Sequence, residues 1–302
     1  MTQLKRRDVL KMGAVLGGSL VTGAYTAVAQ QPQRQRSATD RVKLGKTDIR
    51  VTRVAYGTGS RGGRVQRELG QKEFTRLVRH AYDRGIQFFE SADSYREMHE
   101  MLATALQGID RCSYKLMTKI RPSEAADLEN PRRTVDRFRK ELNSDYFDIL
   151  LMHCVKTSTW PKEYGRLMDQ LDGMKEKQVL LAHGASCHGL SALRAMPGVD
   201  WLDVALLRVN HNGTHMDGDT GQFGEPGKHE EAVASIKKIH ATGTGVIGMK
   251  LIGNGDFTAP EQREASIRLV MNVDCVDAVT IGFKAPSEID EAITRINKHL
   301  NA

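Results

Sequence analysis

The feature that most constrains this chain is a regular alternation of short apolar runs with longer stretches of helical spacing. The apolar or β-branched runs occupy residues 54–56, 86–89, 114–118, 147–152, 179–182, 201–207, 245–249 and 278–281. The helical stretches between them include residues 71–84, 132–142, 162–177, 229–241, 261–271 and 287–300. Short apolar runs separated by helices are typical of buried parallel strands. Eight such strands predict a closed (β/α)₈ barrel, the TIM-barrel class.

Two further features complete the predicted fold. Residues 42–45 and 49–52 flank a Lys46-Thr47-Asp48 turn, which predicts a short β-hairpin before the first barrel strand. The number of strands alone would also fit an open, doubly wound sheet, so this alternative stays open at the level of the sequence.

The first 29 residues have the pattern of an export signal. Arg6 and Arg7 follow Lys5, residues 12–28 are apolar but rich in Gly, Ala and Thr, and Ala27-Val28-Ala29 is a small-residue cleavage pattern. This stretch predicts a twin-arginine signal peptide rather than a membrane span. An uncleaved anchor is the alternative. We therefore expect an exported, periplasmic protein that uses the twin-arginine export machinery.

The polar residues 30–40 predict a disordered linker, which leaves residues 41–302 for the barrel. Removing the signal lowers the formal net charge from +7 to +4, because that segment carries four cations and one acid. The remaining basic residues are spread along the chain and form no block with aromatic residues, so we expect no nucleic-acid partner. The four cysteines lack the close spacing of a zinc site or a disulfide framework.

Reactive side chains follow three successive predicted strands. Glu90 follows residues 86–89, Lys119 follows 115–118, and His153 follows 148–152, while Tyr95 lies five residues beyond Glu90. Each residue alone could be an ordinary solvent-facing or core side chain. Adjacent barrel strands converge at one mouth, however, and barrel enzymes place their chemistry at the carboxyl ends of the strands. Together the four residues predict an active site.

These residues resemble those of the aldo-keto reductase family. Residues 43–47 and 51–54 resemble the family's opening hairpin, and Gly57-Thr58-Gly59 its first strand end. Residues 88–95, Phe-Phe-Glu-Ser-Ala-Asp-Ser-Tyr, are similar to the family's F-[FI]-D-T-A-x-x-Y segment, and residues 279–283 are similar to its last strand. The resemblance extends from about Val42 to Leu300.

The resemblance implies a catalytic tetrad. Tyr95 would be the general acid, Lys119 the cation beside it, Glu90 the carboxylate that orients Lys119, and His153 the group that orients the substrate carbonyl. Glu90 departs from the family's usual aspartate by one methylene. Asp93 lies nearby, but off the matching position.

The resemblance also implies a nicotinamide cofactor, with NADP preferred over NAD. Its contacts would come from Ser186, Asn210, Met249, Lys250, Gly253, Gly255 and Lys284. This region departs most from the family: Cys187 replaces an asparagine, Leu206 a glutamine and Met249 an aromatic residue. Lys250 could supply a charge, and the glycines allow close backbone approach to phosphate.

The predicted function is therefore NAD(P)(H)-dependent reduction of an aldehyde or ketone, or oxidation of a matching sugar-like alcohol. A redox-inactive binding protein and a barrel enzyme that needs no nicotinamide are the alternatives. The Gly-rich loop from Asn210 to Lys228 could act as a lid. Its residues His211, His215 and Asp217 could in principle bind a metal, but we expect a solvated polar loop and no metal site.

Overall fold

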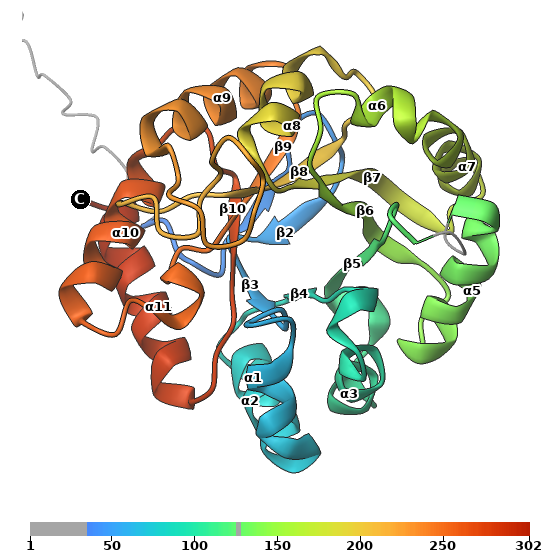
Figure 1. The fold of residues 1–302 in the computed structure, drawn as a ribbon. Helices are drawn as coiled ribbons and strands as arrows, with labels where there is room; N and C mark the ends of the chain where they lie inside the picture. The colour runs from blue at the N-terminus through green and yellow to red at the C-terminus, as the bar shows by residue number, and fades with distance from the viewer. Residues whose placement is uncertain (1–34, 125–127) are drawn as a thin grey trace, which may run out of the picture. The chain divides into compact units, whose positions relative to one another are not determined.

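Eight parallel strands close into a barrel (Figure 1). The computed structural model describes residues 35–124 and 128–302. The spatial order is β10-β3-β4-β5-β6-β7-β8-β9. The strands are β3 (Val54–Gly57), β4 (Phe88–Glu90), β5 (Lys115–Ile120), β6 (Phe147–Val155), β7 (Leu180–Cys187), β8 (Val204–Arg208), β9 (Gly245–Met249) and β10 (Ala278–Ile281). The predicted (β/α)₈ barrel is confirmed, and closure excludes the open doubly wound sheet.

Helices surround the barrel (Figure 1). They are α1 (Arg64–Glu68), α2 (Gly70–Asp83), α3 (Met98–Leu106), α5 (Pro131–Glu141), α6 (Trp160–Glu163), α7 (Gly165–Glu176), α8 (Leu190–Ala195), α9 (His229–Ala241), α10 (Pro260–Asn272) and α11 (Pro286–Leu300). Helix α2 shows why they pack there: its buried residues Phe74, Leu77, Val78 and Ala81 recur on one face. The stretch predicted as one helix over 162–177 is divided into α6 and α7.

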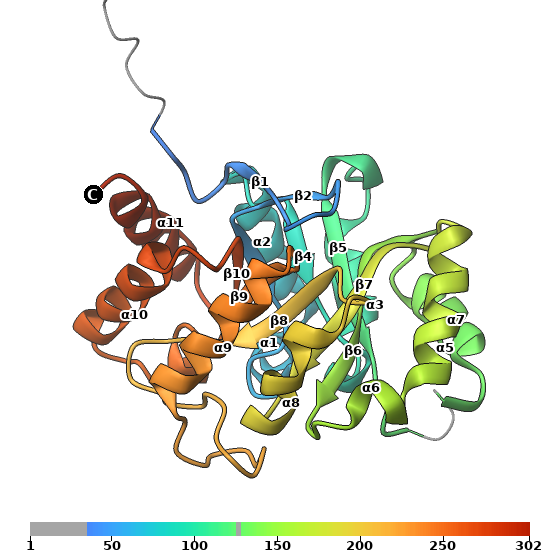
Figure 2. The same ribbon diagram turned by 90° about the horizontal axis from the view of Figure 1, so that it is seen from above.

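The expected hairpin lies at one end of the barrel. Strands β1 (Arg41–Lys43) and β2 (Arg50–Thr52) pair antiparallel, and in Figure 2 they lie at the end opposite the long loop that follows β8. Leu44 and Val51 are fully buried and belong to the same apolar cluster as residues inside the barrel. The hairpin thus closes the end that lies away from the carboxyl ends of the strands.

The fold begins earlier than the sequence indicated. Ala38 is fully buried, its backbone N–H donates to Asn297, and the Arg36 side chain donates to the carbonyl oxygen of Leu300. Arg36 and Ala38, within the predicted linker, therefore pack against the barrel. The predicted signal peptide lies outside the described residues. In the described part of the chain, no helix has both the length and the apolar character needed to cross a bilayer.

Candidate active site

The alternation of side chains along each strand directs the predicted catalytic residues into the barrel. Phe88, Met117 and Leu151 belong to the apolar cluster inside the barrel. Side chains alternate between the two faces of a strand, so Glu90, Lys119 and His153, each two residues further on, face the same interior. Arg208 and Thr280 face the interior for the same reason, because Arg208 lies two residues after Leu206 and Thr280 two residues after Ala278. The mouth is therefore a ring of polar side chains above an apolar layer.

Lys119 is the centre of the site. Its ammonium group donates to a carboxylate oxygen of Glu90, to the Ser91 carbonyl oxygen at 2.8 Å and to the Tyr95 hydroxyl at 3.4 Å. The side chain is 1% exposed, and that of Glu90 is 5% exposed. A buried ammonium ion needs its donors satisfied and its charge balanced. Glu90 and the two oxygen acceptors do both, so Lys119 is held against Tyr95.

Glu90 fits here because the neighbouring strands leave room for the longer side chain. Its second carboxylate oxygen accepts a hydrogen bond from the Thr280 hydroxyl at 3.2 Å. A Cβ added at Gly57 would lie 2.6 Å from that hydroxyl and 3.0 Å from the Glu90 carboxylate. Asp93, the other nearby acid, pairs with Arg137 at 2.9 Å instead. Glu90 is thus the carboxylate that serves Lys119.

Tyr95 lies in a short 3₁₀ turn after β4, and Gly59 makes space for its ring. A Cβ at Gly59 would approach the Tyr95 hydroxyl to 2.6 Å. Burial raises the pKa of Tyr95 well above its usual 10, and the negative charge of Glu90 raises it further. The phenol therefore carries its proton at neutral pH and is a hydrogen-bond donor, as a general acid must be.

His153 stands beside Tyr95 with its ring edge-on, at 5.6 Å between ring centroids. Burial lowers the pKa of His153 well below 6.5, and the charges of Lys119, Arg121 and Lys250 lower it further. The ring is therefore neutral. Its Nδ1 lies 3.1 Å from the Ser94 hydroxyl. When Ser94 donates to Nδ1, the proton of the neutral ring resides on Nε2, where it can be donated to a carbonyl oxygen.

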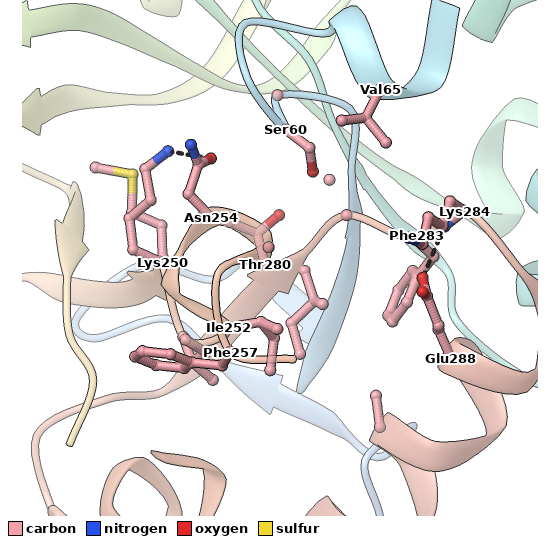
Figure 3. Close-up of a pocket in the computed structure, with 18 of the residues that line it drawn as sticks. Ser60, Val65, Lys250, Ile252, Asn254, Phe257, Thr280, Phe283, Lys284 and Glu288 are labelled. Atoms are coloured by element: carbon pink, nitrogen blue, oxygen red, sulfur yellow. Dashed lines mark hydrogen bonds between the residues drawn. The ribbon is translucent and has the colours of Figure 1, made fainter. Parts of the chain in front are cut away.

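A cavity of about 590 Å³ extends from this cluster along the ends of β9 and β10 (Figure 3). Glu90, Tyr95 and Leu206 line one part of it, and Lys284 and Glu288 line another. Six basic side chains line it, together with the carboxylates of Glu68, Glu90, Glu288 and Glu291; the basic residues are Arg61, Arg64, Lys250, Arg263, Lys284 and Arg295. A long cavity with a polar reacting end and several cations suits a dinucleotide, which is extended and carries phosphate groups.

The predicted cofactor residues divide into two groups. Met249, Lys250, Gly255 and Lys284 line this cavity, whereas Ser186, Asn210 and Gly253 are not among its lining residues. Ser186 accepts the backbone N–H of Cys154 at 2.9 Å. The Asn210 amide group donates to the carbonyl oxygens of Thr214 and Lys250, and its oxygen accepts from the loop backbone. In this structure Ser186 and Asn210 hold backbone segments.

Lys250 is the most perturbed cation of the cavity. Its backbone is left-handed, with a φ of 66°, and its ammonium group donates to Asn254 at 2.9 Å (Figure 3). Burial lowers the pKa of Lys250 to about 8, and the charge of Arg208 contributes. At the other end, the Glu288 carboxylate accepts the backbone N–H of Lys284 at 2.9 Å. Asn254 and Glu288 were not predicted as site residues: Asn254 lies in the 3₁₀ turn Gly253–Gly255, and Glu288 lies in the first turn of α11.

A second polar cluster next to His153 was also missed. The Cys154 sulfur lies 3.4 Å from His188 Nε2, and Arg208 donates to His188 Nδ1. Arg208 is 2% exposed and lies 3.6 Å from Asp217. Its position directly after an apolar strand is the same signal that identified Glu90 and His153. In the described ranges, 35–124 and 128–302, no group of three or more His, Cys, Asp or Glu side chains could hold a metal ion.

Comparison with known proteins agrees with this geometry. A family model described as the Aldo/keto reductase family matches residues 53–299. The chain belongs to the aldo/keto reductase family. A protein of Arabidopsis thaliana named L-galactose dehydrogenase is 27% identical over 141 residues, which is 44% of this chain and 44% of that protein. The match therefore spans less than half the length of this relative.

Solved structures of aldo-keto reductases share the fold. An aldo-keto reductase from Klebsiella pneumoniae, solved in complex with NADPH, has a TM-score of 0.63 and 12% identity, and the match covers 85% of this chain and 89% of that one. A Pseudomonas aeruginosa protein described as an aldo-keto reductase has a TM-score of 0.69 and 21% identity, with coverages of 87% and 97%. At these identities the similarity concerns the barrel itself.

Proposed function

We propose that this aldo/keto reductase catalyses the NAD(P)(H)-dependent reduction of an aldehyde or ketone, or the oxidation of the matching alcohol. One observation carries the proposal: Lys119 is held by Glu90 and donates to the hydroxyl of Tyr95, which keeps its proton. A positioned donor beside a buried cation is the arrangement that protonates an oxygen atom as negative charge develops on it.

Each residue then has a defined task. Tyr95 gives its proton to the carbonyl oxygen, and Lys119 stabilises the phenolate that remains. Neutral His153 donates from Nε2 to the same oxygen and orients the carbonyl group. A nicotinamide bound in the cavity supplies the hydride in reduction and accepts it in oxidation.

We propose NADP(H) as the preferred cofactor. Met249 and Leu206 would contact the nicotinamide end, while Lys250 and the backbone near Gly255 would hold the phosphates. Lys284, Arg263 and Arg295 line the part of the cavity that would receive the 2′-phosphate. Glu288 and Glu291 line the same part: Glu291 pairs with Arg263 and Arg295, and Glu288 is the carboxylate that could accept a free ribose hydroxyl and favour NAD. Titration of Glu288→Gln with NADPH and NADH, compared with Lys284→Gln, tests which charge decides the preference.

The decisive experiment replaces Tyr95 with phenylalanine. Losing a general acid typically costs about 10²- to 10⁴-fold in rate. We expect Tyr95→Phe to lower kcat by that order with a neutral aldehyde such as 4-nitrobenzaldehyde, while the Kd for NADPH stays the same. Unchanged turnover would contradict the assignment of Tyr95. Tyr82→Phe, a change at a hydroxyl bonded to Ser113, is the matched control and should leave kcat unaltered.

We further propose that residues 1–29 direct export by the twin-arginine route. The support is the sequence pattern alone. Replacing Arg6 and Arg7 with lysine should keep the full-length protein in the cytoplasm of a bacterial host, whereas Lys11→Gln should still be exported. Equal export of both variants, measured by cell fractionation, would contradict the proposal.

A further inference from the structure

The side of the site away from the cofactor cavity carries a ladder of rings that leads outward from the catalytic residues. The His153 ring lies 6.5 Å from the ring of His188, and the His188 ring lies 5.0 Å from that of Phe223. Phe223 belongs to the loop between Asn210 and Lys228 and is 68% exposed. The ladder therefore leads from His153 to an aromatic side chain at the surface.

Cations flank the outer end of this ladder. The Arg208 guanidinium carbon lies 5.3 Å from the centre of the Phe223 ring, and the Lys156 ammonium lies 5.8 Å from it. Arg208 is balanced by Asp217, which is itself fixed by the backbone N–H of Gly189 at 2.7 Å. Lys156 is exposed, and among the described residues no carboxylate lies within 4.0 Å of its ammonium group. Lys156 therefore brings an unbalanced positive charge.

The inner part of the ladder holds the neutral His188 ring and the Cys154 thiol beside Arg208, whose charge Asp217 offsets. Burial raises the pKa of the Cys154 thiol, and the charged groups that oppose the rise are all cations: Arg208, Lys119, Lys156 and Lys250. His188 is buried and neutral because its pKa lies well below 6.5. Since Arg208 can only donate, His188 accepts at Nδ1 and carries its proton on Nε2, facing Cys154. No acidic side chain takes part in these contacts.

Lys250 faces both the cofactor cavity and this region, but Lys156 and Phe223 are not among the residues that line the cavity. The phosphates of a cofactor would therefore leave Lys156 unneutralised. In the part of the chain that the structure describes, Lys156 is thus an unpaired cation next to an exposed aromatic ring on the substrate side of the site. Such a position favours the binding of an anion.

We propose that the substrate is an aldehyde or ketone that also carries a carboxylate, and that Lys156 binds this carboxylate beside Phe223. The proposal rests on the proposed function and adds the substrate class. The carbonyl group reacts at Tyr95 and His153, and the carboxylate stays unchanged at Lys156, so the charged group contributes binding and orientation and takes no part in the chemistry.

The test compares matched substrates that differ in one charge. We would measure kcat/KM for 4-carboxybenzaldehyde and for its methyl ester, and for succinic semialdehyde and its methyl ester, with the wild-type enzyme, Lys156→Gln and Lys162→Gln. Lys162 is another exposed lysine, on α6, and is the matched control. We expect the wild-type enzyme to prefer the free acid of each pair. Lys156→Gln should lower that preference about fivefold through KM, as for loss of a partly exposed charged contact, and Lys162→Gln should leave it unchanged.

Two results would overturn the proposal. One is a wild-type enzyme that prefers the esters. The other is an equal effect of Lys156→Gln on acid and ester, which would mean that Lys156 only anchors the Phe223 loop. Failure of the proposed function is a separate outcome, because then the neutral esters are not turned over either. In that event calorimetric titration with 4-carboxybenzaldehyde decides: weaker binding to Lys156→Gln than to Lys162→Gln supports the carboxylate site, and equal binding rejects it.

Discussion

At the scale of single residues, the length of the Glu90 side chain matches the space beside Gly57. One oxygen of the carboxylate reaches Lys119 and the other accepts from Thr280. Aspartate would withdraw the carboxylate by about one bond length, and misplacement of about 1 Å can cost about a hundredfold in rate. We expect Glu90→Asp to lower kcat about ten- to a hundredfold. Asp93→Glu alters a carboxylate that pairs with Arg137 and should change kcat little; wild-type kcat in Glu90→Asp would contradict this account.

Lys250 gives cofactor binding a pH dependence. Its pKa is lowered by burial to about 8, so the ammonium form, and with it the attraction to phosphate, is present below that pH and is lost as the pH rises through it. We expect the Kd for NADPH to increase about fivefold between pH 7 and pH 9. Fluorescence titration of Lys250→Met should give a weaker but flatter profile, whereas Lys284→Met should keep the wild-type slope. A slope that survives in Lys250→Met would assign the titration to another group.

Single residues also show which parts of the site could be predicted from the sequence. Glu90, Lys119 and His153 follow apolar runs in the sequence, so the alternation of side chains along a strand was enough to bring them together with Tyr95. Arg208 follows an apolar run in the same way and could have been found by the same reasoning. Asn254 and Phe223 could not, because a short turn and a long loop bring them to the site, and the paths of these segments depend on the packing of the whole barrel. Glu288 could not, because its place in the first turn of α11 does not reveal how that helix packs against the barrel.

At the scale of elements, the predictions were best where periodicity was strongest. Helix α9 and strands β9 and β10 have the predicted bounds, because each is a clean apolar pattern between glycine-rich or polar segments. The six-residue helix α8 is too short for a periodic signal. Glycine spacing carries less information than periodicity: Gly57, Gly59 and Gly62 at the end of the first barrel strand have the spacing of a dinucleotide-binding motif, yet the sheet closes into a barrel.

The hairpin turn permits a sharp test of how β1 and β2 close the barrel. Gly45 has a φ of 48°, and an added Cβ would approach the Gly243 carbonyl oxygen to 2.2 Å. Gly62 has a φ of 66° but nothing within 4 Å of its Cβ position. Gly62→Ala should therefore cost about 1 kcal/mol of unfolding free energy from backbone strain alone, and Gly45→Ala about 3 kcal/mol or more, because backbone must also move. Equal losses in denaturant unfolding would show that the hairpin can shift without cost.

At the scale of the whole molecule, closure of the barrel both forms the scaffold and brings the residues of the active site together. The carboxyl ends of β4, β5 and β6 supply Glu90, Lys119 and His153, and those of β9 and β10 supply the cofactor cavity, so no catalytic contact is local in sequence. The ring of strands that joins them also has to exclude water from the apolar layer beneath. Binding of a dinucleotide across β9, β10 and the loop after β3 should therefore stabilise the entire barrel, not one segment of it.

This coupling predicts the size of a thermal shift. A ligand at a hundred times its Kd that binds only the folded state adds about 2.7 kcal/mol. For a domain of about this size, 1 kcal/mol corresponds to about 2–4 °C, so NADPH should raise Tm by about 5–10 °C, and NADH by less at the same concentration. Tyr95→Phe should keep the shift, because it removes the acid and not the cofactor site, whereas Lys250→Met should reduce it at fixed NADPH. A folded wild-type protein whose Tm responds to neither nucleotide would instead favour a redox-inactive barrel that binds its ligand without transferring hydride.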